Sequence, residues 1–355
     1  MASLVGAALS VAVVGILCLS SGCSSVGYYA QALGGHVELM RRARPVAAWL
    51  DDAATPAALR ERLALTQRLR DFAVTELALP DNPSYRAYAD LQRGAVVWNV
   101  VATPELSLTL KTWCFPVLGC VGYRGYFDRS GADALAAQLR AEGLEVSVYG
   151  VPAYSTLGWT NWLGGDPLLN TFIHWPEGEL ARLIFHELAH QVAYANDDTT
   201  FNESFATAVE RIGGERWLRT RASAQAQREY AQFDARRRDF RELTVRHRQR
   251  LQQLYASALP DDDKRQRKAE LRATLAAEFT ALKATRWQGF AGYDAWLANA
   301  NNASFAVQAA YDELVPAFER LHEAQGSDLM RFYAAVQRLS ALPKAERGAT
   351  LDAAR

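Results

Sequence analysis

A short segment of the chain combines two histidines with a glutamate at a spacing that suits metal chemistry. Positions 186–190 read HELAH, so His186 and His190 are four residues apart. On a helix both imidazoles would project from one face, where they can bind one cation, and neutral imidazoles are good Zn²⁺ ligands. Glu187 would lie on the adjoining flank, where a carboxylate can accept a proton from water without being a ligand. The segment therefore predicts a catalytic zinc site with Glu187 as general base.

The two histidines need a third protein ligand, because a catalytic zinc usually has three and keeps one position open for water. Glu203 is the preferred candidate. It follows a polar turn and opens a segment with helical apolar spacing, so a helix–turn–helix can return its carboxylate to the histidine face. Asp197 and Asp198 stay open as alternatives, although they lie close to the end of the first helix. The predicted metal ligands are therefore His186, His190 and Glu203, and the predicted cofactor is Zn²⁺.

Two motifs in this region, HELAHQ at 186–191 and NESFA at 202–206, resemble those of the gluzincin metallopeptidases. In gluzincins the glutamate of an Asn-Glu-x-x-Ala motif completes the zinc site, and the resemblance gives that role to Glu203. The chain more closely resembles a family of bacterial envelope lipoproteins for which aminopeptidase activity is inferred, and this likeness covers nearly the whole mature chain. It is also carried by three further segments, at 113–116, 123–127 and 153–159.

The motifs and the spacing of apolar residues predict an α+β fold, in which a zincin-like catalytic core has helical N- and C-terminal flanking regions. The core would consist of a small sheet and the motif helix. We expect four parts along the chain: a signal peptide at 1–22, a lipidated N-terminus and helical region at 23–94, the catalytic core at 95–216, and a helical hairpin with C-terminal helices packed on the core at 217–355.

The first residues predict export. The apolar run from Leu4 to Leu19 is short for a membrane span and suits the core of a signal peptide. The Gly22-Cys23-Ser24 step resembles a bacterial lipobox, in which Cys23 would be lipidated and become the mature N-terminus. We therefore expect a protein on the periplasmic side of the bacterial cell envelope, attached to the membrane by a lipid anchor at Cys23, with the outer membrane favoured. An uncleaved anchor, or cleavage without lipid, stays open.

Local patterns predict the individual helices and strands. In the N-terminal region we expect a helix interrupted at Gly34-Gly35 and a second helix from about Pro56. In the core we expect the motif helix to start near Pro176 and the following helix to stop at Gly213-Gly214. The remaining core elements are β-rich stretches at 95–101, 106–110 and 144–151 and a short helix at 131–143. A charged helical hairpin is expected at 217–286, broken at 259–263.

Two cysteines outside the exported leader and its lipobox form a close pair. Cys114 and Cys120 are separated by five residues that include Pro116 and Gly119, which favour a turn. In an exported protein this pair predicts a local disulfide, with free thiols as the alternative. A zinc thiolate site is not expected, because its cysteines would be two to four residues apart and a second pair would be needed.

Composition limits the partners of the protein. Lys plus Arg equal Asp plus Glu at 39 each, so no net charge favours nucleic acid or an anionic surface. Half of the residues are hydrophobic, which excludes disorder as the general state. The basic stretch at 236–250 is interpreted as a solvated helix, and His247 and His322 as structural. We therefore expect a peptide or protein substrate and no nucleic acid.

Several further residues are candidates for supporting roles. Tyr154 is proposed to stabilise the oxyanion, with Tyr123 and Tyr126 as weaker alternatives. The stretch 151–156 is a candidate for the strand that pairs with the substrate, and an ordinary buried strand is an equal alternative. Glu210 could accept a hydrogen bond from a ligating histidine, although a surface carboxylate is the preferred interpretation. Recognition of a free amine would need acidic groups, for which the candidates are Asp166, Glu177 and Glu179.

The sequence thus predicts a single-zinc metallopeptidase, and the resemblance implies an aminopeptidase. One alternative is an envelope assembly or binding factor that keeps the metal for structural reasons. Glu187 argues against it, since a structural site has no use for a general base. The other alternative is an endopeptidase that acts on misfolded envelope proteins.

Overall fold

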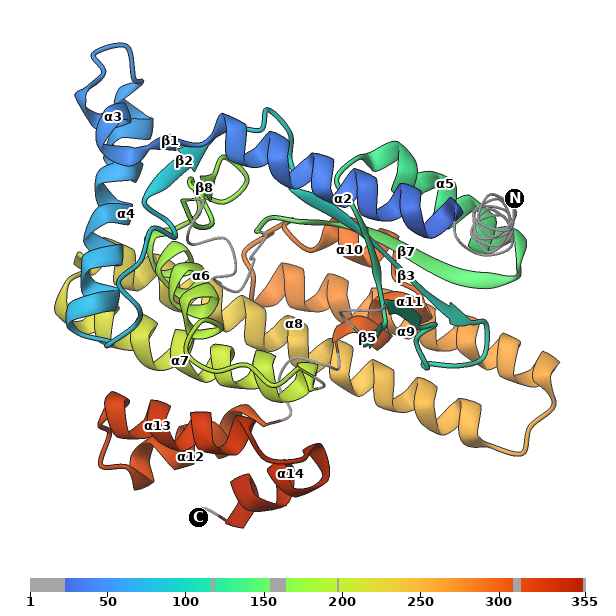
Figure 1. Cartoon of the computed structure of the whole chain (residues 1–355). Coiled ribbons are helices and arrows are strands. Elements are labelled where there is room, and N and C mark those ends of the chain that lie inside the picture. Colours follow the sequence, from blue (N-terminus) through green and yellow to red (C-terminus); the bar gives the residue numbers. More distant parts are fainter. Residues whose placement is uncertain (1–22, 116–118, 154–163, 197, 309–313, 354–355) are drawn as a thin grey trace, which may run out of the picture.

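The computed structural model describes residues 23–115, 119–153, 164–196, 198–308 and 314–353 (Figure 1). Long helices are combined with three small sheets, which is consistent with an α+β protein. The predicted signal peptide at 1–22 and the oxyanion candidate Tyr154 lie outside the described residues. Within the described part of the chain, every helix is too short or too polar to cross a membrane.

Three helices form the N-terminal region: α2 (Cys23–Arg42), α3 (Val46–Asp51) and α4 (Ala57–Thr75). The predicted start of the last helix near Pro56 is confirmed, because Pro56 is its N-cap. The predicted interruption at Gly34-Gly35 is wrong, since α2 continues through both glycines. A Cβ atom at Gly35 would lie 2.1 Å from the ring of Phe127, so this glycine lets the helix pass close to that ring.

A three-stranded antiparallel sheet of order β6-β3-β7 follows these helices. Its strands are β3 (Val97–Pro104), β6 (Arg124–Tyr126) and β7 (Leu144–Val151). The strand predicted at 144–151 is confirmed, and it pairs with β3 along its whole length. The helix predicted at 131–143 is α5 (Arg129–Ala141), which packs on one face of the sheet (Figure 1).

The strand predicted at 106–110 is wrong. After β3 the chain turns, and the carbonyl of Pro104 accepts a hydrogen bond of 3.2 Å from the N–H of Ser107. The following residues do not form a strand. Leu108 packs instead against the hydrophobic cluster of the helical hairpin described below. The alternation of apolar and polar residues here serves this packing and not a strand pairing.

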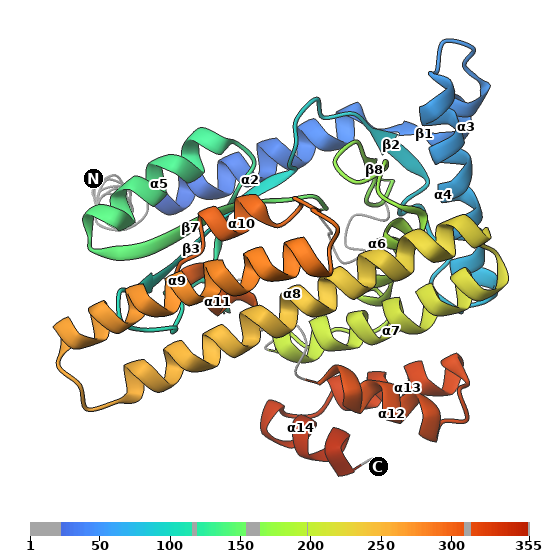
Figure 2. The same cartoon turned by 180° about the vertical axis from the view of Figure 1, so that it is seen from behind.

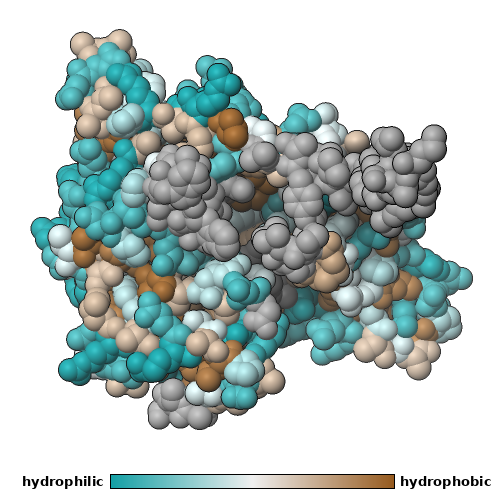
Figure 3. All heavy atoms as spheres, in the orientation of Figure 1, coloured by the Kyte–Doolittle hydropathy of each residue, from teal (hydrophilic) through white to brown (hydrophobic). Residues whose placement is uncertain are grey.

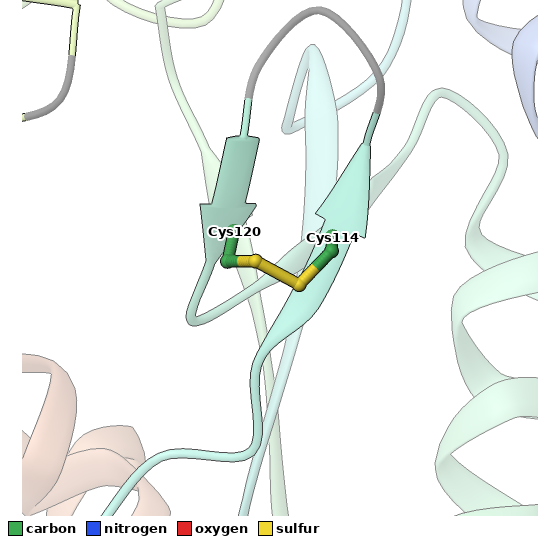
Figure 4. The surroundings of a disulfide bond; sticks show 2 residues. All are labelled: Cys114 and Cys120. Atoms are coloured by element: carbon green, nitrogen blue, oxygen red, sulfur yellow. A yellow bond between two sulfur atoms is a disulfide. The ribbon is translucent and has the colours of Figure 1, made fainter.

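The other described strands form two smaller sheets. One has the order β1-β2-β8, with β1 (Arg44–Pro45), β2 (Ala87–Ala89) and β8 (Leu168–Leu169); the other pairs β4 (Trp113–Phe115) with β5 (Gly119–Val121). Cys114 and Cys120 lie directly opposite each other in β4 and β5 and form a disulfide bond (Figure 4). The bond holds this hairpin together across its two strands.

The motif helix and its successor are α6 (Glu177–Ala189) and α7 (Thr199–Thr220), which pack closely together. The predicted start of α6 is confirmed, because Pro176 is its N-cap. The predicted end of α7 at Gly213-Gly214 is wrong, since the helix continues beyond both. A Cβ atom at Gly213 would lie 2.6 Å from Leu77 and 2.9 Å from Phe185, so the glycine permits close packing.

The predicted charged hairpin is confirmed as α8 (Ala224–Ala256) and α9 (Asp261–Thr285), which lie side by side (Figure 2). The prediction of a solvated basic face at 236–250 is wrong in part. Phe240 and Leu243 are buried in the hairpin cluster, and Arg237 forms a short ion pair with α6. His247 is also buried, with its ring 4.9 Å from that of Phe305.

The described residues after the hairpin form five shorter helices: α10 (Asp294–Ala298), α11 (Asn302–Gln308), α12 (Val315–Ala324), α13 (Leu329–Ser340) and α14 (Lys344–Ala353). The largest hydrophobic cluster joins α12 and α13 to α4, α6 and α7. Phe205 on α7 lies at this junction, with its ring 5.8 Å from the rings of Phe318 and Phe332. The coloured residues on the face seen in Figure 3 are mainly hydrophilic, and the hydrophobic patches among them are small and separate.

Candidate metal centre

The orientation of α6 follows from its apolar residues. Leu180, Ile184 and Leu188 recur at helical spacing and are fully buried, which fixes the rotation of the helix about its axis. His186 therefore projects from a different face, and His190, the C-cap residue, follows one turn later. The N–H of His190 still donates to the carbonyl of His186 at 3.3 Å, so the helical geometry extends to both histidines.

The loop between α6 and α7 is held by Asn202, the first residue of the NESFA motif. The side chain of Asn202 accepts a hydrogen bond from the N–H of Ala195 and donates one to its carbonyl, both at 2.7 Å. Asp198 caps the start of α7 by accepting from the N–H of Phe201 at 3.1 Å. These contacts place Glu203 in the first turns of α7 and direct the chain back toward α6.

The three predicted ligands meet at one point. The Nε2 atoms of His186 and His190 are 3.2 Å apart. The carboxylate of Glu203 lies 3.4 Å from Nε2 of His186 and 3.8 Å from Nε2 of His190. Two nitrogen ligands that bind one Zn²⁺ at 2.0–2.1 Å with a tetrahedral angle are about 3.3 Å apart. The three side chains are therefore spaced closely enough to bind one small cation together.

The two imidazoles differ in protonation. Burial lowers the pKa of His186, but its hydrogen bonds with Glu203 and Glu210 outweigh this and raise the pKa well above the usual value. Burial and the neighbouring His186 lower the pKa of His190 to about 4, so that ring is neutral, as metal ligation requires. His190 therefore offers a lone pair, whereas a metal ion would have to displace the proton that Glu203 and Glu210 hold on His186.

The preferred interpretation of Glu210 as a surface carboxylate is wrong, and the alternative of a hydrogen bond with His186 is confirmed. Its side chain is only 14% exposed, and its Oε2 accepts a hydrogen bond from Nδ1 of His186 at 2.9 Å. Its Oε1 forms a short ion pair with Arg182. Burial would raise the pKa of Glu210, but the charges of Arg182 and His186 lower it to about 2. When the ring of His186 is neutral, donation from Nδ1 leaves its lone pair on Nε2, toward Glu203.

The alternative ligands and the predicted general base have distinct positions. Asp198 is committed to the cap of α7 and to an ion pair of 2.8 Å with Arg347, which rules it out as a rival to Glu203. Asp197 lies outside the described residues. Glu187 is partly exposed, and its charge is close enough to raise the pKa of His186. It therefore lies beside the ligands, on the accessible side of α6.

Two exposed tyrosines border the site. Tyr123, in the turn between β5 and β6, is 41% exposed. Partial loss of solvent around it, together with Tyr149 and the charge of Glu203, raises its pKa to about 12. Tyr194 has its ring 6.4 Å from that of His190, in an edge-on arrangement. Sequence reasoning ranked Tyr123 low and missed Tyr194, although its position four residues after His190 continues the histidine face.

The other predicted supporting residues lie elsewhere. Tyr126 packs edge-on against Tyr28 at 5.8 Å, on the side of β6 that faces α2. Asp166 is buried, and its carbonyl accepts from the N–H of Tyr85. Glu177 accepts from the indole of Trp217 at 2.8 Å. The carboxylate of Glu177 is therefore used within the fold, and Asp166 is too deeply buried to meet a substrate amine.

Glu179 is also engaged away from the histidines. Its Oε2 lies 2.6 Å from the guanidinium of Arg237. At a rise of about 1.5 Å per residue, Glu179 is about 10 Å along α6 from His186. It cannot serve as an amine-binding group at the ligand end without leaving this ion pair.

Two imidazoles, of which one is buried and one is partly exposed, and a carboxylate, on two successive helices with a glutamate beside them, define a class of site that can hold a divalent cation. The chain belongs to the family described as "Putative aminopeptidase", whose model matches residues 27–351. No curated protein and no solved structure shows significant similarity to the chain. The family supports a peptidase as the general class of reaction.

Proposed function

We propose that the chain is a zinc-dependent peptidase in which His186, His190 and Glu203 bind one Zn²⁺ and Glu187 is the general base. The observation that carries this proposal is the convergence of two Nε2 atoms, 3.2 Å apart, on the carboxylate of Glu203. Two imidazoles and one carboxylate are a common donor set of catalytic zinc. The sheet β6-β3-β7 with the α6–α7 pair would then form a zincin-like core.

The residues of the chain divide the work of hydrolysis. When bound, Zn²⁺ would supply Lewis-acid polarisation of the scissile carbonyl and lower the pKa of water to about 7. Glu187 would take a proton from the attacking water and deliver it to the departing amine. Glu210 orients His186 by accepting from Nδ1. Tyr194, whose ring lies 6.4 Å from that of His190, and Tyr123, whose pKa responds to the charge of Glu203, would contact the substrate.

The family name suggests that this peptidase is an aminopeptidase, and we take this as the first form of the proposal. A specific observation favours the endopeptidase alternative. The three acidic groups predicted to bind a free amine, namely Asp166, Glu177 and Glu179, are buried or bonded to other parts of the fold. Comparison of peptides with free and blocked N-termini decides between the two: hydrolysis of free-amine peptides alone indicates an aminopeptidase, and equal hydrolysis of blocked peptides indicates an endopeptidase.

We also propose that the protein is a lipid-anchored envelope protein on the periplasmic side, attached at Cys23 and favouring the outer membrane. The disulfide between Cys114 and Cys120 supports an oxidising compartment. The mass of the N-terminal peptide from membrane-extracted protein tests the anchor. A mature chain that begins at Cys23 with attached acyl groups supports it, and an unmodified Cys23 would contradict it.

The central experiment compares the purified full-length protein with its Glu187→Gln variant. Both proteins should contain one zinc per chain, because Glu187 is not a ligand. The variant should hydrolyse peptides about 10²- to 10⁴-fold more slowly, the usual contribution of a positioned general base. A Glu215→Gln variant, changed at an exposed carboxylate of α7, should keep full activity. Equal activity of the parent and Glu187→Gln would refute the assigned mechanism, and absence of zinc from both would refute the metal site.

A further inference from the structure

A row of buried charges leads from the metal centre to the helical hairpin. Glu210 accepts from His186 on one side and pairs with Arg182 on the other. Arg182 faces Glu179, with 3.8 Å between the guanidinium and the carboxylate. Glu179 in turn pairs with Arg237 of α8 at 2.6 Å. Charges of alternating sign thus connect the predicted zinc ligand His186 on α6 with Arg237 on α8.

The middle of this row is deeply buried. The side chains of Arg182 and Glu179 are 10% and 11% exposed. Among the described residues, Nη1 of Arg182 and Oε1 of Glu179 have no hydrogen-bond partner, and these two atoms face each other across 3.8 Å. A buried charge without compensation is costly, which means that each member holds its neighbour in place. The far end is fixed by Asp234, which lies 2.8 Å from Arg237.

The surrounding packing makes room for these long side chains. A Cβ atom at Gly214 of α7 would lie 2.8 Å from Cγ of Arg182, so the glycine leaves space for the arginine. A Cβ atom at Gly178 of α6 would lie 2.5 Å from the ring of Tyr230 on α8. The guanidinium groups of Arg182 and Arg237 lie 5.9 and 6.0 Å from that same ring. Two glycines and a tyrosine therefore shape a compartment for the charges.

We propose that Arg237 of α8 is a positioning residue for the metal centre, acting through Glu179 and Arg182 on Glu210 and hence on the ring of His186. The inference rests on the proposed zinc site. It means that the α8–α9 hairpin contributes to the affinity of that site for zinc. Partners behind ligating histidines typically change metal affinity 10- to 100-fold when removed. Arg182 contacts Glu210 directly, and Arg237 reaches Arg182 only through Glu179.

The test measures the zinc dissociation constant of the full-length protein by competition with a chelator. The key variant combines Glu179→Gln with Arg237→Gln, which removes one charge of each sign and keeps the net charge of the compartment. We expect it to bind zinc about 10-fold more weakly. The matched control combines Arg250→Gln with Glu278→Gln, which removes an ion pair of 2.8 Å between α8 and α9. The control should bind zinc within two-fold of the parent.

The unfolding temperature of the metal-free proteins separates positioning from general stability. Both double variants are expected to lose some stability, but only the first should lose zinc affinity. Equal affinity of the Glu179→Gln/Arg237→Gln variant and the parent, or equal weakening in the control, would overturn the proposal. If the key variant does not fold, the single Arg237→Gln change is judged by the same criterion, since Arg237 is 29% exposed. A parent that binds no zinc would overturn the metal centre itself, which is a distinct result.

Discussion

At the scale of single residues, the meeting of the three proposed ligands could be predicted from the sequence because their geometry is local. His186 and His190 lie one helical turn apart, and Asn202 fixes the loop that returns Glu203 to them. Glu210 and Arg182 were misjudged or missed for the opposite reason. Both are polar residues on helices, and only the packing of α7 on α6 shows that their charged groups meet inside the protein.

The position of Glu210 has a consequence for acid stability. Its pKa is about 2 in the folded protein, against an ordinary value of 4.5, so the unfolded chain takes up this proton first as the pH falls. The stabilisation from this group is complete above about pH 4.5 and is lost between about pH 4.5 and 2, with a magnitude on the order of 3 kcal/mol. Unfolding free energies of the metal-free protein across this range measure it.

The matched comparison for this prediction uses Glu210→Gln and Glu215→Gln, which change a buried and an exposed carboxylate of the same helix. Glu210→Gln should flatten the dependence of stability on pH below pH 4.5, and Glu215→Gln should leave it unchanged. The slope is the informative quantity, because loss of Glu210 also leaves Arg182 without its closest partner. A slope that is unaltered in Glu210→Gln would show that its carboxyl does not carry the effect.

At the scale of helices and strands, glycine was the main source of error. Gly34-Gly35 and Gly213-Gly214 were both interpreted as helix ends, yet α2 and α7 continue through them. Local sequence does not reveal whether a glycine is needed for its backbone freedom or for its missing side chain. Helix starts at proline and the strand β7 were predicted well, because the signals that define them lie within the element itself.

The packing role of Gly213 predicts a stability change. Gly213→Ala would bring a methyl group within 2.6 Å of Leu77 and 2.9 Å of Phe185, so overpacking should destabilise the protein by about 1–3 kcal/mol. Gly34→Ala is the control, because no atom lies within 4 Å of a Cβ there. That change should stabilise α2 by about 0.5–1 kcal/mol, as alanine favours a helix interior. Chemical denaturation of both variants measures the difference, and a stabilised Gly213→Ala would show that α7 packs less closely on α6.

At the scale of the whole molecule, the predicted succession of helices, small sheet, motif helix and charged hairpin agrees with the order of elements described. What the sequence did not reveal is how distant parts meet at the site. The C-terminal helix α14 reaches back through Arg347 to Asp198 at the start of α7. The turn before β6 brings Tyr123 toward Glu203. Such contacts depend on the packing of whole elements, and no local pattern encodes them.

The proposed zinc site joins α6 to α7, so removal of the metal should lower the stability of the whole chain. A ligand that binds only the folded state stabilises it by about 2.7 kcal/mol at a free concentration 100-fold above its dissociation constant. The unfolding temperature should therefore rise when zinc is added to metal-free protein. Glu203→Gln should abolish most of this rise, whereas Glu215→Gln should retain it, because only Glu203 lies within 4 Å of both histidines. An undiminished rise in Glu203→Gln would remove Glu203 from the ligand set and leave the joining of α6 to α7 to packing alone.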